Sequence, residues 1–106
     1  MQFVMFVCAE AGLRLTPQEA SPEAWVEETE RRGVRLEGDR LQSPSDATTV
    51  RESGRLITDG PFAETREQIG GYDLLECADL DEAIEIVSKH PMAKFGAIEV
   101  RPVWTR

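Results

Sequence analysis

The segment Asp59-Gly60-Pro61-Phe62 combines a carboxylate with a sharp change of chain direction. In a tight turn, aspartate accepts hydrogen bonds from nearby backbone amides, glycine permits unusual dihedral angles and proline fixes the next one. The same carboxylate at a strand end can face a cleft, where Asp59 would act as an acid, a base or a ligand anchor. We favour the turn role and keep catalysis by Asp59 as the alternative. Phe62 is expected to plug the core, with stacking on a ligand as its alternative.

Charged side chains on predicted strands form a second candidate group. Arg51 and Glu76 lie on separate strands, while Glu99 and Arg101 share one face of the last strand, two residues apart. Charges that line the interior of a barrel must pair with each other or bind something. A carboxylate–guanidinium set suits a small polar or anionic ligand, and Tyr72 would add a hydroxyl. We favour a structural salt-bridge network over a ligand pocket, and charges on strands usually lie at edges or on solvated faces.

Histidine and cysteine are too few, and too far apart, to predict a metal site, and we expect no cofactor. His90, the only histidine, precedes Pro91 at the end of a predicted helix, where the helix dipole favours a cation. We therefore expect a capping role for it. Cys8 and Cys77 lie in apolar, strand-like segments without metal-ligand spacing. We expect both to be reduced, buried and unreactive thiols.

The strands that position these residues are predicted from side-chain alternation. Residues 2–8 are apolar on both faces, so we expect helices to cover one face and a second subunit the other. Residues 48–58 predict a hairpin that turns at Glu52-Ser53-Gly54. Further strands are expected at 34–41, with a turn at Gly38-Asp39, at 72–78 and at 97–104.

Capping patterns predict the helices. Thr16 with Glu19, and Ser21-Pro22, offer two starts for a first helix that ends at Gly33, and we favour the later start. Residues 65–71 combine a capping-box pattern with two glycines, which predicts a very short helix. The clearest helix begins after Asp79 and stops at Pro91.

The composition defines the class of protein. The length of 106 residues predicts a single domain, 1–106. Of the residues, 41% are hydrophobic and 30% are charged, and this composition argues against disorder. The net charge of −8 opposes binding to phosphate backbones, so no nucleic-acid partner is expected. The longest apolar run, residues 3–9, is too short to span a membrane, and no basic segment precedes it. We therefore expect a cytoplasmic protein without a membrane partner.

The predicted order is strand, helix, strands, strand, helix, strand, which indicates an α+β, ferredoxin-like sheet with an inserted hairpin. Residues 59–65, Asp-Gly-Pro-Phe-Ala-Glu-Thr, followed by 68–72, Gln-Ile-Gly-Gly-Tyr, resemble the hallmark of the DGPF-motif, YCII-related family. Residues 48–51, 79–83 and 98–103 match the family's strand before the motif, its last helix and its last strand. The resemblance covers nearly the whole chain.

The resemblance implies a ferredoxin-like fold assembled as a dimeric α+β barrel, in agreement with the two-sided apolar first strand. It also implies genes that lie beside those of extracytoplasmic-function sigma factors, and hence a partner linked to sigma-factor regulation. Better-described members carry a histidine on the first helix, proposed to form a dyad with an aspartate. The matching stretch here, Ser21 to Trp25, has no histidine, so that dyad does not carry over.

Two functions remain. The favoured one is a non-enzymatic homodimer that binds a small molecule or a protein partner. The alternative is a cofactor-free enzyme that acts on a small polar molecule, with Asp59 and either Arg101 or Glu76 as acid–base and anchoring groups. A cleft that holds a perturbed carboxylate beside an arginine would favour ligand binding or chemistry.

Overall fold

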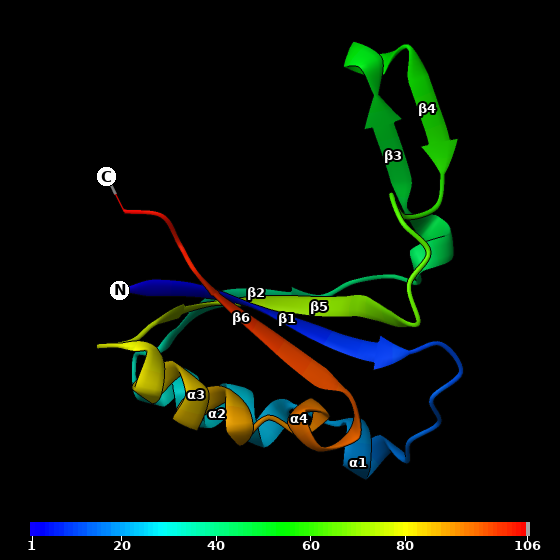
Figure 1. Ribbon diagram of the computed structural model, residues 1–106. Helices are drawn as coiled ribbons and strands as arrows, with labels where there is room; N and C mark the ends of the chain where they lie inside the picture. Colours follow the sequence, from blue (N-terminus) through cyan, green and yellow to red (C-terminus); the bar gives the residue numbers. More distant parts are fainter. Residues whose placement is uncertain (106) are drawn as a thin grey trace.

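A four-stranded antiparallel sheet forms the centre of the computed structural model, which describes residues 1–105 (Figure 1). Its order is β2-β5-β1-β6, with β1 at Gln2–Glu10, β2 at Arg35–Arg40, β5 at Glu67–Glu76 and β6 at Ala97–Pro102. Every neighbouring pair is antiparallel, which is the strand arrangement of a ferredoxin-like sheet. The predicted α+β class is therefore confirmed, while assembly into a dimeric barrel stays a prediction.

Helices cover one face of this sheet (Figure 1). The two longer helices are α2 (Glu23–Arg31) and α3 (Leu80–Ser88), and two short ones are α1 (Pro17–Ala20) and α4 (Met92–Phe95). Nε1 of Trp25 on α2 donates a hydrogen bond to the backbone oxygen of Ile86 on α3 over 2.9 Å. The core between helices and sheet consists of Phe3, Met5, Trp25, Val34, Leu75, Cys77, Ala83, Ile86 and Val87.

Both predicted starts of the first helical region are used, by different helices. Thr16 and Glu19 form a reciprocal capping box at α1, and α2 begins directly after Pro22. At α3, the Asp79 carboxylate accepts from the backbone N–H of Glu82 over 2.9 Å, as its spacing predicted. These local bonds place α2 and α3 against the sheet in the register that buries their apolar stripes.

The predicted hairpin is confirmed, and it stands away from the sheet on the side opposite the helices (Figure 1). Strands β3 (Thr48–Arg51) and β4 (Leu56–Asp59) pair only with each other. At its base, the Gly60 amide donates to Ala47 over 2.7 Å, and Thr49 Oγ1 donates to the Gly60 oxygen over 2.8 Å. The radius of gyration is 15.1 Å, whereas a compact domain of this length has about 13 Å. The hairpin is thus an extended arm.

Two predictions of secondary structure are wrong. Residues 65–71 form no helix, because β5 begins at Glu67 and pairs with Glu10 of β1. A sheet pairing between distant segments has overridden the local capping pattern. Strand β2 continues through Gly38 without a turn, because this glycine pairs with Asp73 inside the sheet.

Alternation along the strands gives the sheet two faces. Phe3, Met5 and Leu75 point to the helices and are fully buried. The opposite side, here called the open face, carries Val4, Phe6, Cys8, Tyr72, Leu74, Glu76, Glu99 and Arg101. Its apolar side chains are only partly buried. Within the described chain, therefore, one face of β1 is covered, as expected, and the other is not. No helix in residues 1–105 is long and apolar enough to cross a membrane.

Candidate functional site

Three of the predicted site residues lie on the arm. Asp59 ends β4 opposite Thr48 and is exposed to solvent. Arg51 donates from Nη2 to the backbone oxygen of Phe62 over 3.3 Å. Phe62 itself is 77% exposed, so the prediction of a core plug is wrong. The physical reason is that its loop belongs to an arm that packs against no core.

The remaining four predicted residues lie on the open face. Arg101 Nη2 pairs with Glu99 Oε2 at 2.5 Å, and its guanidinium lies 6.0 Å from the centre of the Phe6 ring. Tyr72 is the pairing neighbour of Phe6, on the next strand. Glu76 Oε2 accepts from the N-terminal amine over 2.7 Å. The predicted pairing on one face is present, but within residues 1–105 no hydrogen bond or ion pair joins Asp59 to Arg101 or Glu76. The functional roles of all these residues stay predictions.

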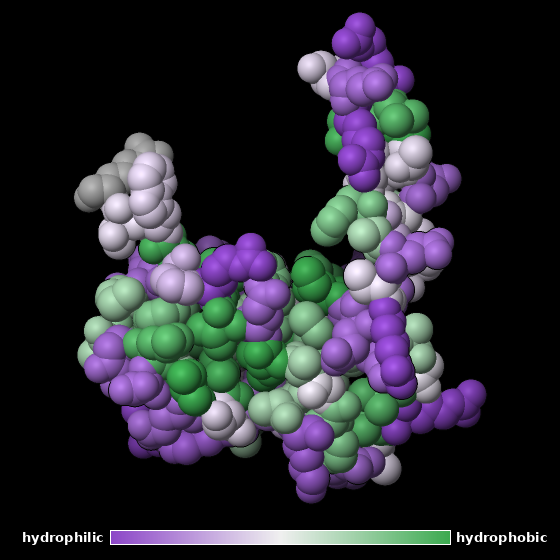
Figure 2. Space-filling view, viewed as in Figure 1, coloured by the Kyte–Doolittle hydropathy of each residue, from purple (hydrophilic) through white to green (hydrophobic). Residues whose placement is uncertain are grey.

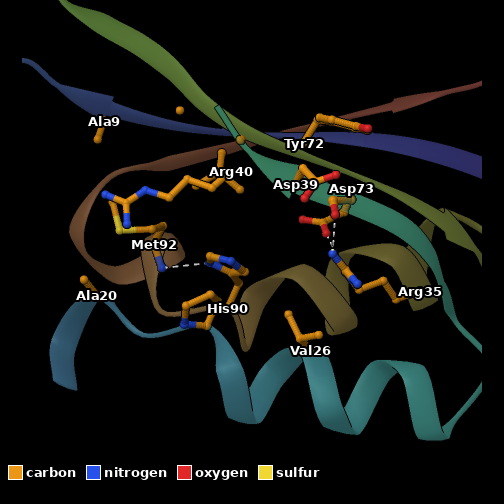
Figure 3. A pocket seen from close by; sticks show the side chains of 15 residues that line it. Ala9, Ala20, Val26, Arg35, Asp39, Arg40, Tyr72, Asp73, His90 and Met92 are labelled. Carbon is orange, nitrogen blue, oxygen red and sulfur yellow. Dashed lines mark hydrogen bonds and ion pairs between the residues drawn. The ribbon is translucent and has the colours of Figure 1, made fainter. Parts of the chain in front are cut away.

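The structure adds a cleft that the sequence reasoning missed. It has a volume of about 340 Å³ and lies on the helix face, between the sheet and the helices (Figure 3). Val7, Val26 and Met92 provide apolar walls. Its charged and polar side chains on the helix face are Arg35, Arg40, Asp73 and His90. They come from β2, β5 and the end of α3, which no local sequence pattern connects.

A buried ion pair forms one side of this cleft. Arg35 Nε and Asp73 Oδ1 lie 2.7 Å apart, and only 13% and 8% of their side chains are exposed. Arg35 also donates to the Gly38 oxygen over 2.8 Å and pairs with Glu30 at 2.6 Å. Burial raises the pKa of the Asp73 carboxyl, and the Arg35 guanidinium opposes that rise. A perturbed carboxylate beside an arginine is therefore present, but on the face opposite to the predicted one.

Gly38 makes this ion pair sterically feasible. A Cβ at this position would lie 2.0 Å from Asp73 Oδ1 and 2.6 Å from the Tyr72 oxygen. Any larger residue would displace the carboxylate from its place in the cleft. The glycine that the sequence suggested as a turn residue thus provides space for a side chain of the neighbouring strand.

His90 lies on the helix side of the cleft and is 6% exposed. Its ring contacts Trp25 edge-on at 4.9 Å, and its Nδ1 accepts the backbone N–H of Met92 over 3.0 Å. Burial lowers its pKa to about 4, so the ring is neutral at pH 7. The predicted role as a cation at the end of the preceding helix is wrong: Lys89 is the C-cap of α3, and His90 accepts the first backbone N–H of α4 as a neutral ring.

The second ring nitrogen of His90 opens onto the cleft. Because Nδ1 accepts a hydrogen bond, the proton of the neutral ring lies on Nε2. Nε2 makes no hydrogen bond within residues 1–105. Every fully buried side-chain nitrogen or oxygen in that range has a hydrogen-bond partner, so an atom without a partner, such as Nε2, is not fully buried. Nε2 is therefore accessible, and it offers one N–H donor to a molecule in the cleft.

Arg40 contributes a positive charge on the opposite side. In Figure 3 it extends from β2 along the sheet side of the cleft, while His90 and Met92 lie on the helix side. In the part of the chain that the structure describes, no carboxylate lies within ion-pair distance of Arg40. The Tyr72 hydroxyl points away, toward the open face (Figure 3). The cleft therefore offers a free cation, a neutral N–H donor and apolar walls.

The sequence of the chain was compared with known protein families. The YCII-related domain matches residues 10–105. This chain belongs to the YCII-related family. Its place in the DGPF subgroup stays a prediction. The first helical region contributes Pro22 and Val26 to the cleft, and the imidazole of His90 comes from the segment after α3.

Two further proteins resemble the chain. An uncharacterized protein of Rhizobium meliloti (strain 1021) is 43% identical over 68 residues, which cover 60% of this chain and 55% of that protein. The match thus spans about half the length of that curated relative. The solved structure of 5-chloro-2-hydroxyhydroquinone dehydrochlorinase from Burkholderia phenoliruptrix AC1100, in complex with 2,5-dihydroxybenzoquinone, matches with a TM-score of 0.60 at 18% identity. It aligns with 99% of this chain and 94% of its own and supports the fold.

Proposed function

We propose that this chain binds a small organic oxyanion in the cleft on the helix face of its sheet. The observation that carries the proposal is the pairing of Arg40, a cation without a carboxylate partner in the described chain, with the Nε2–H of a neutral His90. Arg40 would hold the negative charge, and His90 would donate to a second oxygen. Val7, Val26 and Met92 would contact the apolar part of the molecule.

The magnitudes support a small ligand of modest affinity. A cleft of about 340 Å³ lies at the lower end of the range for ligand sites, roughly 300–1,000 Å³. A hydrogen bond to a charged group contributes about 1.5–3 kcal/mol net, which is roughly a factor of ten to a hundred in the dissociation constant. Arg40 is exposed, so we expect its contribution near the lower value.

An enzyme is the second candidate, and one observation favours it. Asp73 has a raised pKa and lines the same cleft as the His90 donor. An N–H donor can polarise a carbonyl oxygen, and a carboxylate of raised pKa is suited to proton transfer. The dehydrochlorinase with the similar fold acts on a hydroxyhydroquinone, which makes hydroxyquinoid compounds a reasonable class to assay. Asp59, with Arg101 or Glu76, remains the alternative acid–base set.

Calorimetric titration with benzoate, salicylate and 2,5-dihydroxybenzoquinone, the molecule bound in the similar structure, tests the binding proposal. We expect Arg40→Gln to raise the dissociation constant about tenfold. The matched control is Arg101→Gln, which removes an exposed arginine from the opposite face and should leave binding unchanged. Equal losses in both variants, or no binding across the panel, would contradict the proposal.

The enzyme candidate needs a separate readout. Chloride release from 5-chloro-2-hydroxyhydroquinone, named for the dehydrochlorinase, should occur with the wild-type chain and be lost in Asp73→Gln. Because this variant also disturbs the partner of Arg35, its fold must be checked by circular dichroism. Ligand binding without any turnover would support the binding function alone. A protein partner linked to sigma factors stays a prediction from the family resemblance.

A further inference from the structure

Asp73 contributes a carboxylate oxygen to the cleft that the binding of an oxyanion leaves unused. Its Oδ1 accepts a hydrogen bond from Nε of Arg35 over 2.7 Å, whereas its Oδ2 accepts none within residues 1–105. As for Nε2 of His90, an oxygen without a partner in that range is not fully buried. Because Asp73 lies on the helix face and lines the cleft, Oδ2 is available to a molecule there. An ionised carboxylate accepts hydrogen bonds and donates none, so the partner of Oδ2 must be a donor.

We propose that Asp73 selects ligands that carry a hydroxyl group at the end opposite to their acid group. This inference rests on the proposed function, because it takes the acid group to be held by Arg40 and His90. The hydroxyl would donate its hydrogen to Oδ2 of Asp73, and the apolar part of the molecule would lie between the two polar contacts. The ligand class is thereby narrowed from any small oxyanion to a hydroxylated one, such as a ring carboxylate with a hydroxyl across the ring.

Arg35 does not offer a second anchor for an anion at this end of the cleft. Each of its three nitrogens already donates a hydrogen bond, to Asp73, to Glu30 and to the Gly38 oxygen. Its single positive charge faces two carboxylates, so the group as a whole is negative. A second anion placed there would be repelled, whereas a hydroxyl would form a charge-assisted hydrogen bond. The two ends of the cleft therefore suit opposite partners, an anion beside Arg40 and a donor beside Asp73.

The pairing of the strands determines how far apart these two ends lie. Arg40 of β2 pairs with Gly71 of β5, and Asp73 follows two residues further along β5 on the same face. Diagonal neighbours of this kind lie roughly 7–8 Å apart. In Figure 3 the Arg40 side chain extends away from Asp73, which increases the distance between their charged groups. A molecule that reaches both must carry its polar groups far apart, as on opposite sides of a six-membered ring.

Gly71 keeps the space between the two ends open. It pairs with Val7 on one side and with Arg40 on the other, so a side chain at this position would share their face and point into the cleft. Its Cβ would lie 3.9 Å from Cβ of Val7 and 3.7 Å from Cα of Arg40. Because glycine has no side chain, its backbone forms a floor on which the middle of the ligand can lie, with Val26 and Met92 as the facing walls.

The larger hollow of the molecule does not compete for such a ligand. It has a volume of about 810 Å³ and lies between the arm and the open face. Figure 2 shows this side of the molecule as a broad hollow beside the arm. Asp46, Glu67 and Glu99 line it, and no arginine, lysine or histidine of residues 1–105 does. A carboxylate would be repelled there, so binding of a carboxylate can be assigned to the cleft.

Calorimetric titration with a series of benzoates at pH 7 tests the proposal. 4-Hydroxybenzoate carries its donor opposite to the acid group, and phenols ionise only near about pH 10. We expect it to bind about tenfold more tightly than benzoate, because its hydroxyl gains a charged acceptor. 4-Methoxybenzoate has no hydrogen to donate and should bind no more tightly than benzoate. Salicylate should also bind like benzoate, because its hydroxyl lies beside the acid group, away from Asp73.

Asp73→Asn tests the acceptor directly, because it keeps the size of the side chain. The amide retains an oxygen for Arg35 and presents an N–H donor to the cleft. In this variant we expect 4-hydroxybenzoate and 4-methoxybenzoate to bind with similar affinity. The matched control is Glu30→Gln, which removes the other carboxylate of Arg35, outside the cleft, and should keep the tenfold preference. If Asp73→Asn does not fold, the series of benzoates on the wild-type chain still decides the question.

The outcomes separate this inference from the binding proposal. Equal affinities for benzoate and 4-hydroxybenzoate, both weakened in Arg40→Gln, would overturn the role of Asp73 and leave the binding proposal intact. Tighter binding of salicylate than of 4-hydroxybenzoate would also overturn it, because the donor contact would then lie beside the acid group. No binding of any benzoate would contradict the binding proposal and this inference with it. A preference for 4-hydroxybenzoate that Asp73→Asn abolishes and Glu30→Gln retains would establish Asp73 as the residue that recognises the hydroxyl.

Discussion

The backbone N–H of Met92 donates to Nδ1 of His90 over 3.0 Å, and this bond joins the end of α3 to the start of α4. A second proton on the ring would have to bind at Nδ1, where the Met92 N–H already points. Protonation would therefore break the hydrogen bond and place a charge on a side chain that is buried, only 6% exposed. Both effects oppose the charged form, in agreement with the lowered pKa.

The free energy of unfolding is expected to fall as the pH drops from about 6.5 to about 4. The ordinary pKa of histidine is 6.5, and that of His90 in the folded chain is about 4. Between these values the unfolded chain binds a proton that the folded chain does not, so acid favours unfolding. Above pH 6.5 the contribution is fully present, and its loss amounts to about 3 kcal/mol at most. Urea unfolding measured across this pH range checks it.

His90→Gln provides the control for this pH dependence. The variant should show a flatter loss of stability between the two pKa values, because its side chain does not titrate. The Asp73 carboxyl has a raised pKa and contributes with the opposite sign, since the folded chain takes up its proton first. Asp73 is present in both proteins, so its contribution largely cancels when the unfolding free energies of the wild-type chain and His90→Gln are subtracted. Parallel curves for the two proteins would contradict the assignment to His90.

Removing the carboxylate of Asp73 should destabilise the fold by about 3–5 kcal/mol, because it leaves Arg35 buried without its closest partner. Asp73→Asn tests this in urea unfolding at pH 7. The matched control is Glu30→Gln, which removes the other carboxylate of the same arginine, at a side chain that is 55% exposed. That change should cost under about 1 kcal/mol. Similar losses in both variants would argue against a buried pair.

Gly38→Ala should destabilise the chain by about 1–3 kcal/mol through crowding. Its new Cβ would collide with the Asp73 carboxylate and the Tyr72 backbone. Gly70→Ala, on β5, is the matched control, because the nearest atom to its Cβ would be 3.9 Å away. Thermal unfolding distinguishes the two. A wild-type midpoint for Gly38→Ala would show that the ion pair tolerates displacement.

Local patterns in the sequence predicted the helices and strands better than they predicted the residues of the cleft. The hairpin was predicted correctly, because its strands pair with neighbours only a few residues away. The helix expected at residues 65–71 is instead the start of β5, because Glu67 pairs with Glu10, and no local pattern reveals a partner so far along the chain. The same limitation hid the cleft. Asp73 alternates with open-face residues and shows nothing in sequence of its ion pair with Arg35.

His90 illustrates the difference between position and environment. Its place just after a helix was predicted correctly, but its bond to the start of α4 was not. Its neutral state could not be predicted, because it depends on burial against Trp25, which lies on another helix. A charged histidine is the default at an exposed helix end, and burial reverses that default.

The arm should be the least protected paired segment of the monomer. Amide hydrogens of β3 and β4 are expected to exchange faster than those of β1 and β5, because a two-stranded hairpin is only marginally stable by itself. If the arm contacts a second copy, its protection should rise with protein concentration. Hydrogen exchange followed by mass spectrometry at two concentrations checks this. Arm protection that is high and independent of concentration would contradict both statements.

The side chains of strand β5 point alternately to the two faces of the sheet. This alternation determines where the chain can change length during evolution. Asp73 points to the cleft, while its neighbours Tyr72 and Leu74 point to the open face. Loss or gain of one residue within Glu67–Glu76 would exchange the two sets and disrupt the cleft and the open face together. The turn at residues 52–54 lies outside the sheet, so length changes there would leave both intact. Natural insertions and deletions should therefore concentrate at the tip of the arm.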